Sequence, residues 1–189
     1  MRMPVMFVGH GSPMIALENN ELTKSLRDTG EYVQNAYGKP HAIVVMSAHR
    51  YTGGTAVVTD KKPRQIYDMY GFPEELYRLK YDVEGDEELA HRVLQMLGED
   101  AFEDKEWGID HGVWGPFVHL FPDADIPIVE IGVSSRLSES DIYTLGEKLS
   151  PLRDEGICIV GSGNIVHNLR YVDYSVEGGY GDAVFFTKQ

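Results

Sequence analysis

The hydrophobic residues of the chain fall into short, continuous runs rather than alternating positions. The runs are rich in Val and Ile and are mostly bounded by Gly, Pro or Asp. Continuous runs of this length are typical of strands covered on both faces, whereas alternation is typical of strands with one face in water. We therefore predict buried strands over residues 5–8, 42–46, 55–58, 126–133 and 157–160.

Between these runs, apolar residues recur at helical spacing. We predict helices over residues 21–37, over residues 86–98 with Gly98 at the end, and from a cap at Ser138 or Ser140 onward. The expected inward positions are Leu22, Leu26, Val33, Leu89, Val93, Leu94, Leu97, Ile142, Leu145 and Leu149. Strands alternating with helices predict the α/β class, with a single central, mostly parallel or mixed sheet and helices on both faces (a three-layer sandwich).

Residues 53–77 contain the longest irregular stretch. It carries three tyrosines together with Phe72 and Pro73, so we expect an ordered loop over a site rather than a flexible segment. The sequence shows no internal repeat, low-complexity tract or linker. Residues 1–189 are therefore predicted to form a single domain.

Composition and charge narrow the class of partner. The 189 residues carry a formal net charge of −13, and the isoelectric point is about 4.9. An acidic surface repels phosphate backbones and anionic lipid, so neither nucleic acid nor membrane is expected as a partner. The apolar residues before Gly9 are too few for a signal peptide or a membrane span. Cys158 is the single cysteine and has apolar neighbours, which favours a buried thiol and a reducing cytoplasm.

Three histidines lie at or just beyond predicted strands. His10 stands between two glycines after the first run, and His49 and His167 follow two later runs. Because ligands gather where strands of an α/β sheet end, these imidazoles are candidates for one metal site. His10 and His49 are expected on adjacent strand ends, close enough to share an ion at about 2.0–2.2 Å. A fourth histidine, His111 in "WGIDHGVWG", is a weaker candidate on sequence alone, and structural roles are expected for the others, at positions 41, 91 and 119.

With these residues in place, the sequence resembles the class III extradiol ring-cleavage dioxygenases, in particular their 4,5-DOPA dioxygenase-like subgroup. The resemblance runs over residues 4–170. It rests on six segments in order: "GHGSPM", "AIVVMSAHRYTGGTAV", "YDMYGFPEELY", "WGIDHGVWGPF", "FPDADIPIVEIGV" and "GSGNIVHNLR".

The resemblance implies roles for the histidines. His10 and His49 match two metal ligands, His111 matches a substrate-side histidine with a catalytic role, and His167 matches the acid–base histidine. It also implies non-haem Fe(II) for activity, Zn(II) in purified protein, and a catechol and O₂ as substrates. One catechol hydroxyl must lose a proton, which a histidine with a pKa near neutrality can accept. Tyr70 and Phe72, with Tyr67, are expected either to form an apolar wall over the ring or to be ordinary core.

Members of that family extend further at the C-terminus, where their third metal ligand lies. The chain is therefore expected to lack the family's C-terminal portion. Water, a neighbouring chain, His111 or His167 could fill the third position. Apolar surface left open by the missing part would make a homo-oligomer an option.

Three other hypotheses about the function stay open at this point. A zinc-dependent hydrolase would use zinc on His10 and His49, with Asp110 as the only acid beside a motif histidine. A nucleotide-binding domain is suggested by Gly161-x-Gly163, but the third glycine of the fingerprint is absent. The last alternative is a truncated, non-catalytic remnant that binds metal or nothing.

Overall fold

The computed structural model of the chain describes residues 1–165. Within them, six strands form one sheet in the order β1-β6-β2-β5-β3-β4. The strands are β1 (Val5–Gly9), β2 (Ala42–Thr52), β3 (Thr55–Val58), β4 (Ala101–Asp104), β5 (Ile128–Ser134) and β6 (Ile157–Gly163). The pairings are parallel except that between β3 and β5. All five predicted strands are present, and the expectation of one mixed sheet is confirmed.

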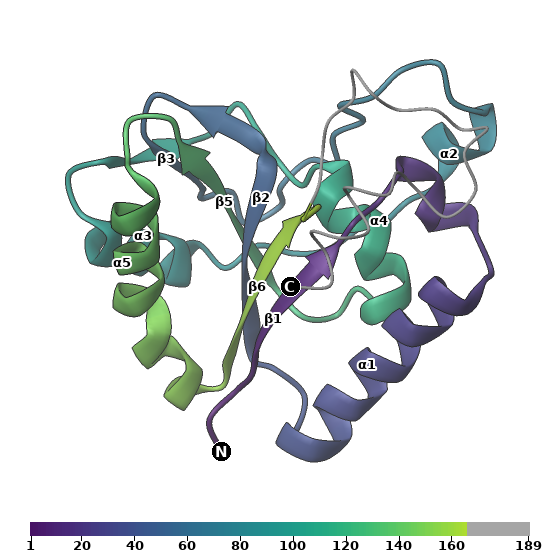
Figure 1. The fold of residues 1–189 in the computed structure, drawn as a ribbon, viewed down its shortest axis with the longest axis horizontal. Helices are drawn as coiled ribbons and strands as arrows, with labels where there is room; N and C mark the ends of the chain where they lie inside the picture. Colours follow the sequence, from purple (N-terminus) through teal and green to yellow (C-terminus); the bar gives the residue numbers. More distant parts are fainter. Residues whose placement is uncertain (166–189) are drawn as a thin grey trace.

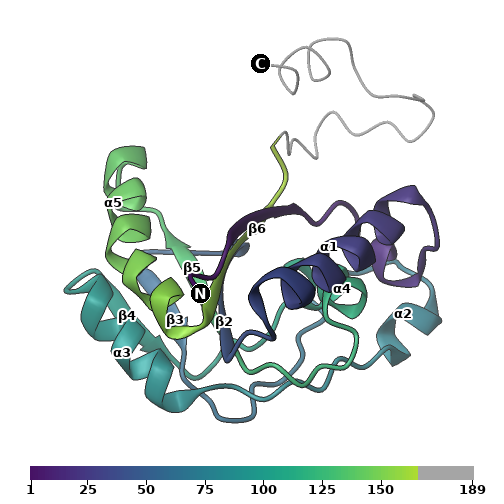
Figure 2. The same ribbon diagram turned by 90° about the horizontal axis from the view of Figure 1, so that it is seen from below.

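Helices cover both faces of this sheet (Figure 1). Helix α4 (His111–Leu120) packs with α1 (Glu21–Tyr37) and with the short 3₁₀ turn η1 (Pro13–Leu17) on one face. Helix α3 (Glu87–Leu97) packs with α5 (Glu139–Leu149) on the other, and η2 (Ser150–Glu155) follows α5. A short helix, α2 (Glu74–Arg78), lies beside η1. Figure 2 shows the three layers, so the predicted sandwich is confirmed.

Each of the three predicted helices begins directly after a capping residue. Asn20, Asp86 and Ser138 cap α1, α3 and α5 with side-chain oxygens that accept backbone N–H groups. The prediction for α5 therefore resolves to Ser138 rather than Ser140. One inward position was wrong: Leu22 is 49% exposed, and Thr23 is buried in its place. Thr23 belongs to the capping box with Asn20, and Leu26 and Val33 further along α1 are buried as predicted.

Two hydrophobic clusters fill the spaces on either side of the sheet. The first joins the sheet to α1 and α4 around Trp114 and Phe117, and the second joins it to α3 and α5 around Val93 and Leu145. Cys158 on β6 is fully buried, and burial raises the pKa of its thiol to about 12. The expectation of a small buried residue is confirmed. Across residues 1–165, none of the helices is long and apolar enough to cross a membrane.

The sheet order changes one expectation about the site. Strands β1 and β2 are not neighbours, because β6 lies between them and pairs in parallel with both. The carboxyl ends of the three strands still lie at one edge of the sheet, because parallel strands end on the same side. His10, which follows β1, and His49, near the end of β2, therefore approach one another across the end of β6.

Candidate functional site

His10 is held at the end of β1 by backbone and side-chain contacts to β6. Its backbone N–H donates to the carbonyl of Gly163 at 3.2 Å, and its Nδ1 lies 3.1 Å from Ser162 Oγ. The Ser162 hydroxyl donates to the backbone carbonyl of Gly112. Because a carbonyl oxygen can only accept, Oγ accepts from Nδ1–H of His10. The lone pair of the neutral ring therefore lies on Nε2 of this buried histidine.

His49 lies in an irregular part of β2. Met46 pairs with Ile131 and Tyr51 with Val133, so β2 has more residues than β5 between these two pairs. A Cβ on Gly132 would lie 2.5 Å from the carbonyl oxygen of Arg50, so this glycine makes room for the bulge. Bulges re-aim side chains beside active sites. Here the bulge brings His49 to the carboxyl edge of the sheet.

Two carboxylates face Nδ1 of His49. Asp110 Oδ1 lies 3.3 Å away and Asp68 Oδ2 lies 3.6 Å away. Burial lowers the pKa of His49, but the hydrogen bond and negative charge of Asp110 and the charge of Asp68 outweigh it, so the pKa is raised. As an acceptor for Nδ1–H, Asp110 leaves the lone pair of the neutral His49 ring on Nε2.

Asp110 is fully buried and caps the N-terminus of α4. Its side chain accepts the backbone N–H of Gly112 at 2.9 Å and the hydroxyl of Ser47 at 2.7 Å. Burial raises the pKa of Asp110, but hydrogen bonds from His49, Glu130 and Ser47 outweigh this effect and lower the pKa to about 2. Asp110 is therefore an ionised acceptor at neutral pH.

Glu130 lies behind Asp110 in the middle of β5. It accepts the backbone N–H of Asp110 at 3.1 Å and the indole N–H of Trp107 at 3.0 Å. Burial and the neighbouring charge of Asp110 raise its pKa well above the ordinary value. Burial therefore favours the protonated form of Glu130, which lies behind the capping carboxylate.

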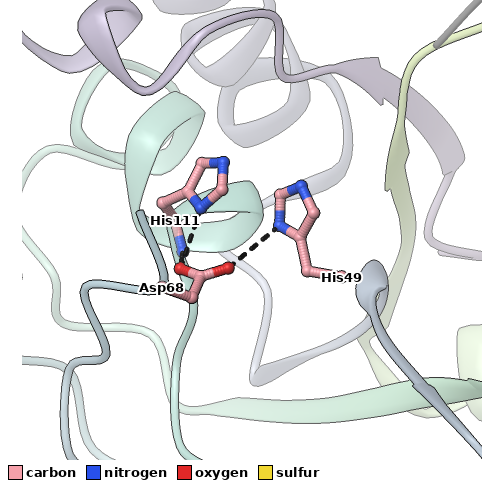
Figure 3. Close-up of side chains that lie close together, drawn as sticks. All are labelled: His49, Asp68 and His111. Atoms are coloured by element: carbon pink, nitrogen blue, oxygen red, sulfur yellow. Dashed lines mark hydrogen bonds and ion pairs between the residues drawn. The ribbon is translucent and has the colours of Figure 1, made fainter. Parts of the chain in front are cut away.

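His111 is the first residue of α4, and Asp68 contacts it twice. Asp68 Oδ1 lies 2.8 Å from the ring Nδ1 and 3.0 Å from the backbone nitrogen. The His111 ring stacks on the His49 ring, with centroids 4.0 Å apart and planes inclined by 24°. Figure 3 shows both rings turning one nitrogen toward Asp68 and the other away from it.

The three imidazoles form one cluster with a common chemistry. The His10 ring centroid lies 4.5 Å from that of His49 and 5.9 Å from that of His111. In His10 and His49, Nδ1–H has an acceptor in the protein, as in histidines that bind a metal through Nε2. The ring centroids of these two histidines are close enough for two nitrogens to reach one ion at the usual bond length of about 2.0–2.1 Å. The donor set therefore fits a divalent metal held by His10 and His49.

The position of His111 differs from that of a third ligand. One ligand atom each of His49, Asp68 and His111 lies within 4.8 Å of the others, so this trio also has the composition of a metal site. However, the stacked rings of His49 and His111 lie in nearly parallel, separate planes. One ion cannot lie in both ring planes at the usual bond length of about 2.1 Å. In this arrangement His111 stands beside an ion held by His49 rather than binding it.

A cavity of about 410 Å³ opens at the same edge of the sheet. His10 and His49 line it together with apolar side chains from β1, β2 and β5, including Phe7, Met46 and Val133. A mostly apolar pocket with a few convergent polar groups is typical of small-molecule sites. It has room for a single aromatic ring beside the two histidines.

The remaining predicted residues are more dispersed. Phe72 is partly buried and packs against the core, whereas Tyr70 is 92% exposed and not packed over the histidines. Tyr67 packs on the core and donates its hydroxyl to the carbonyl of Leu79 at 2.6 Å. His167 lies outside the described residues. Of the histidines expected to be structural, His41 and His91 are exposed, and His119 is buried with Nε2 2.8 Å from the carbonyl oxygen of Ile15.

Two carboxylates of this site were not predicted from the sequence, and neither were Ser47 and Ser162. Asp68 stands in the segment "YDMYGF", in which only the aromatic residues were predicted to contact the substrate. Glu130 stands inside a predicted buried strand. A carboxylate in an apolar strand is itself a signal, because buried acids need specific partners. Asp68 carried no such signal, because its partner is distant in sequence.

Comparison with known proteins identifies the family to which the chain belongs. The family model described as the catalytic LigB subunit of aromatic ring-opening dioxygenase matches residues 4–183. A protein named 4,5-DOPA dioxygenase extradiol from Escherichia coli (strain K12) is 45% identical over 175 residues, covering 92% of this chain and 63% of that protein. A protein of the same name from Beta vulgaris is 39% identical over 166 residues, covering 85% and 61%.

A solved structure is also similar. The crystal structure of an uncharacterized protein from Escherichia coli K12 matches with a TM-score of 0.81 and 39% identity, covering 99% of this chain and 70% of that one. The chain spans about three fifths of the length of the two curated relatives. The family match itself covers nearly the whole sequence, from the first strand past the end of β6. The chain therefore belongs to the family of the catalytic LigB subunit of aromatic ring-opening dioxygenase.

Proposed function

We propose that the protein is a non-haem, metal-dependent extradiol dioxygenase that opens the ring of a DOPA-like catechol with O₂. The observation that carries this proposal is a cluster of three imidazoles, in which His10 and His49 line a cavity of about 410 Å³ and His111 stacks on His49. Membership of the ring-opening family supports the reaction class. The names of the two relatives support a DOPA-like substrate.

In this proposal His10 and His49 hold the metal through Nε2, Fe(II) for activity and Zn(II) as an occupant of purified protein. When bound, the metal supplies the Lewis-acid and redox chemistry that neutral imidazoles cannot. Ser162 and Asp110 fix the two rings by accepting their Nδ1–H groups.

His111 and His167 have the proton-handling roles. Nε2 of His111 faces away from Asp68 and is placed to accept a hydrogen bond or a proton from a catechol hydroxyl. His167 is proposed as the acid–base partner. Tyr70 and Phe72 are proposed as substrate contacts that would approach the ring when the substrate is bound. We also propose that the protein works in a reducing, cytoplasmic setting, because its only cysteine is a buried thiol.

The hydrolase alternative is less well supported. It needs Asp110 as a base for water, but this carboxylate is fully buried and accepts hydrogen bonds from Ser47 and Gly112. Its low pKa makes it a weak base. The family match also favours ring opening over hydrolysis.

Oxygen uptake by the Fe(II)-loaded chain tests the proposal. The protein is reconstituted anaerobically with Fe(II), mixed with DOPA, protocatechuate or 4-methylcatechol, and followed with an oxygen electrode and by the absorbance of the ring-opened product. We expect uptake with at least one catechol, and loss of uptake in His10→Ala and His49→Ala. His91→Ala, on the exposed face of α3, is the matched control and should keep full activity. An iron-loaded chain that consumes no oxygen with any of these catechols would contradict the proposal.

A further inference from the structure

We propose that Asp68 is a positioning residue for His111. Its carboxylate holds the imidazole with the proton on Nδ1, so that Nε2 is presented to the substrate as a proton acceptor. The identity of that substrate rests on the proposed function, but the pairing of the two residues does not. Asp68 belongs to the segment between β3 and α2, which the sequence suggested as an ordered loop over a site.

The contacts of Asp68 fix both the position and the rotation of His111. One carboxylate oxygen lies 3.0 Å from the backbone nitrogen and 2.8 Å from the ring Nδ1. An ionised carboxylate can only accept, so Nδ1 must carry the proton and Nε2 the lone pair. The side chains of both residues are nearly buried, at 12% and 11% exposure, so little water competes for the bond. Removal of the carboxylate would leave the ring free to change tautomer and rotate.

The backbone beside Asp68 is anchored, so the carboxylate is held in place. Gln65 and Ile109 form an isolated parallel bridge, and the backbone N–H of Ile66 donates to the carbonyl of Ile109 at 2.9 Å. This pairing sets the segment that contains Asp68 alongside the segment that leads into His111. The aspartate therefore meets the histidine through a fixed backbone register rather than by a chance side-chain contact.

A role as metal ligand is the main competitor for Asp68. The carboxylate also lies 3.6 Å from Nδ1 of His49, so both rings turn the same nitrogen toward it. An ion bound there would have to lie in both ring planes. The two rings are stacked and inclined by only 24°, so their planes do not meet at a normal metal–nitrogen distance. The contacts fit two N–H donors facing one acceptor group. Asp68 therefore orients imidazoles, with the stronger contact to His111.

The tautomer of His111 can be read directly by NMR on the full chain loaded with Zn(II). Long-range ¹H–¹⁵N correlation separates a protonated from an unprotonated ring nitrogen, and a His111→Gln spectrum assigns the signals. We expect Nδ1–H and an unprotonated Nε2 for His111 in the wild type. In Asp68→Ala this pattern should give way to the Nε2–H form or to a mixture. Asp68→Asn retains a carbonyl acceptor and should preserve most of the wild-type pattern.

Metal content and turnover complete the test. Asp68→Ala should retain one equivalent of zinc by elemental analysis, and in the iron-loaded protein kcat should fall by about 10²-fold, the range for losing a general acid or base. Asp68→Asn should recover part of that loss. Asp82→Ala, at an exposed aspartate in the segment between α2 and α3, is the control and should change none of the three measurements.

The outcomes separate this proposal from the proposed function. An unchanged His111 tautomer in Asp68→Ala overturns the positioning role, whether or not the enzyme turns over. Loss of bound zinc in Asp68→Ala also overturns it, because Asp68 would then be a ligand. If the tautomer changes and zinc is retained but the wild type opens no catechol, the positioning role stands and the proposed reaction fails.

Discussion

Gly112 lies directly beside the His49 ring. A Cβ at this position would lie 2.8 Å from Nδ1 of His49 and 3.1 Å from Oδ1 of Asp110. We predict that Gly112→Ala displaces the His49 ring from its acceptor and weakens zinc binding by about 10–100-fold, the range for loss of the groups that orient a metal ligand. Competition with a chelating dye measures the zinc dissociation constant.

Gly146→Ala is the matched control for this substitution. Gly146 also lies in a helix, α5, but outside its chain neighbours and the backbone of its own helix no atom lies within 4 Å of the position of its missing Cβ. The zinc affinity of this variant should equal that of the wild type. Equal zinc affinity in Gly112→Ala as well would show that the closeness of Gly112 to His49 has no bearing on the metal.

Glu130 predicts a pH dependence of stability. Burial raises the pKa of its carboxyl above the ordinary value of 4.5. At a pH between 4.5 and the folded-state pKa, the folded protein therefore holds a proton that the unfolded chain has released. The free energy of unfolding should therefore fall in this window as the pH rises, by at most about 1.4 kcal/mol per pH unit.

Glu130→Gln removes this titration while keeping an uncharged side chain with an acceptor for Trp107. Relative to the wild type, the variant should become progressively more stable as the pH rises above about 5, until the folded-state pKa of Glu130 is passed. Urea unfolding at several pH values gives the difference in free energy. A difference that stays constant over this range would mean that Glu130 is ionised in the folded protein.

At the scale of elements, helices α1 and α4 contact each other at a glycine. A Cβ on Gly30 would lie 1.8 Å from the backbone carbonyl oxygen of Leu120, at the end of α4. Helix propensity alone favours Ala over Gly by about 1 kcal/mol. Because the backbone of α4 blocks the added methyl, we predict instead that Gly30→Ala lowers the free energy of unfolding by about 1–3 kcal/mol, the usual effect of overpacking.

Urea unfolding of Gly30→Ala beside Gly146→Ala checks this prediction. The control should be as stable as the wild type or more so, since its methyl group meets no atom within 4 Å. If Gly30→Ala is also as stable as the wild type, the two helices can separate at little energetic cost, and the close contact does not hold them together.

The elements that sequence predicted well are those specified by neighbouring residues. Helices α3 and α5 begin after Asp86 and Ser138, whose side chains cap them within three residues. The bulge at His49 was not predicted, because it depends on Gly132 in another strand. Strand β4 was also missed. It is a short edge strand with an exposed Phe102, so it lacks the apolar run of a buried strand.

At the scale of the whole molecule, the site exists because parallel strands end at one edge. That rule allowed His10 and His49 to be predicted as a pair from sequence, although β6 separates their strands. Asp68 could not be predicted in the same way. Its contact with His111 depends on the pairing of Gln65 with Ile109, which lie 44 positions apart in the chain and show no shared pattern.

The central proposal is that His10 and His49 together hold a metal ion. Anomalous diffraction from crystals of the zinc-loaded protein, recorded on both sides of the zinc absorption edge, locates the ion directly. The account predicts one peak within about 2.0–2.2 Å of Nε2 of both histidines, with His111 beside it and not bound. A peak between His49, Asp68 and His111, or a zinc ion that His10 does not contact, would contradict it.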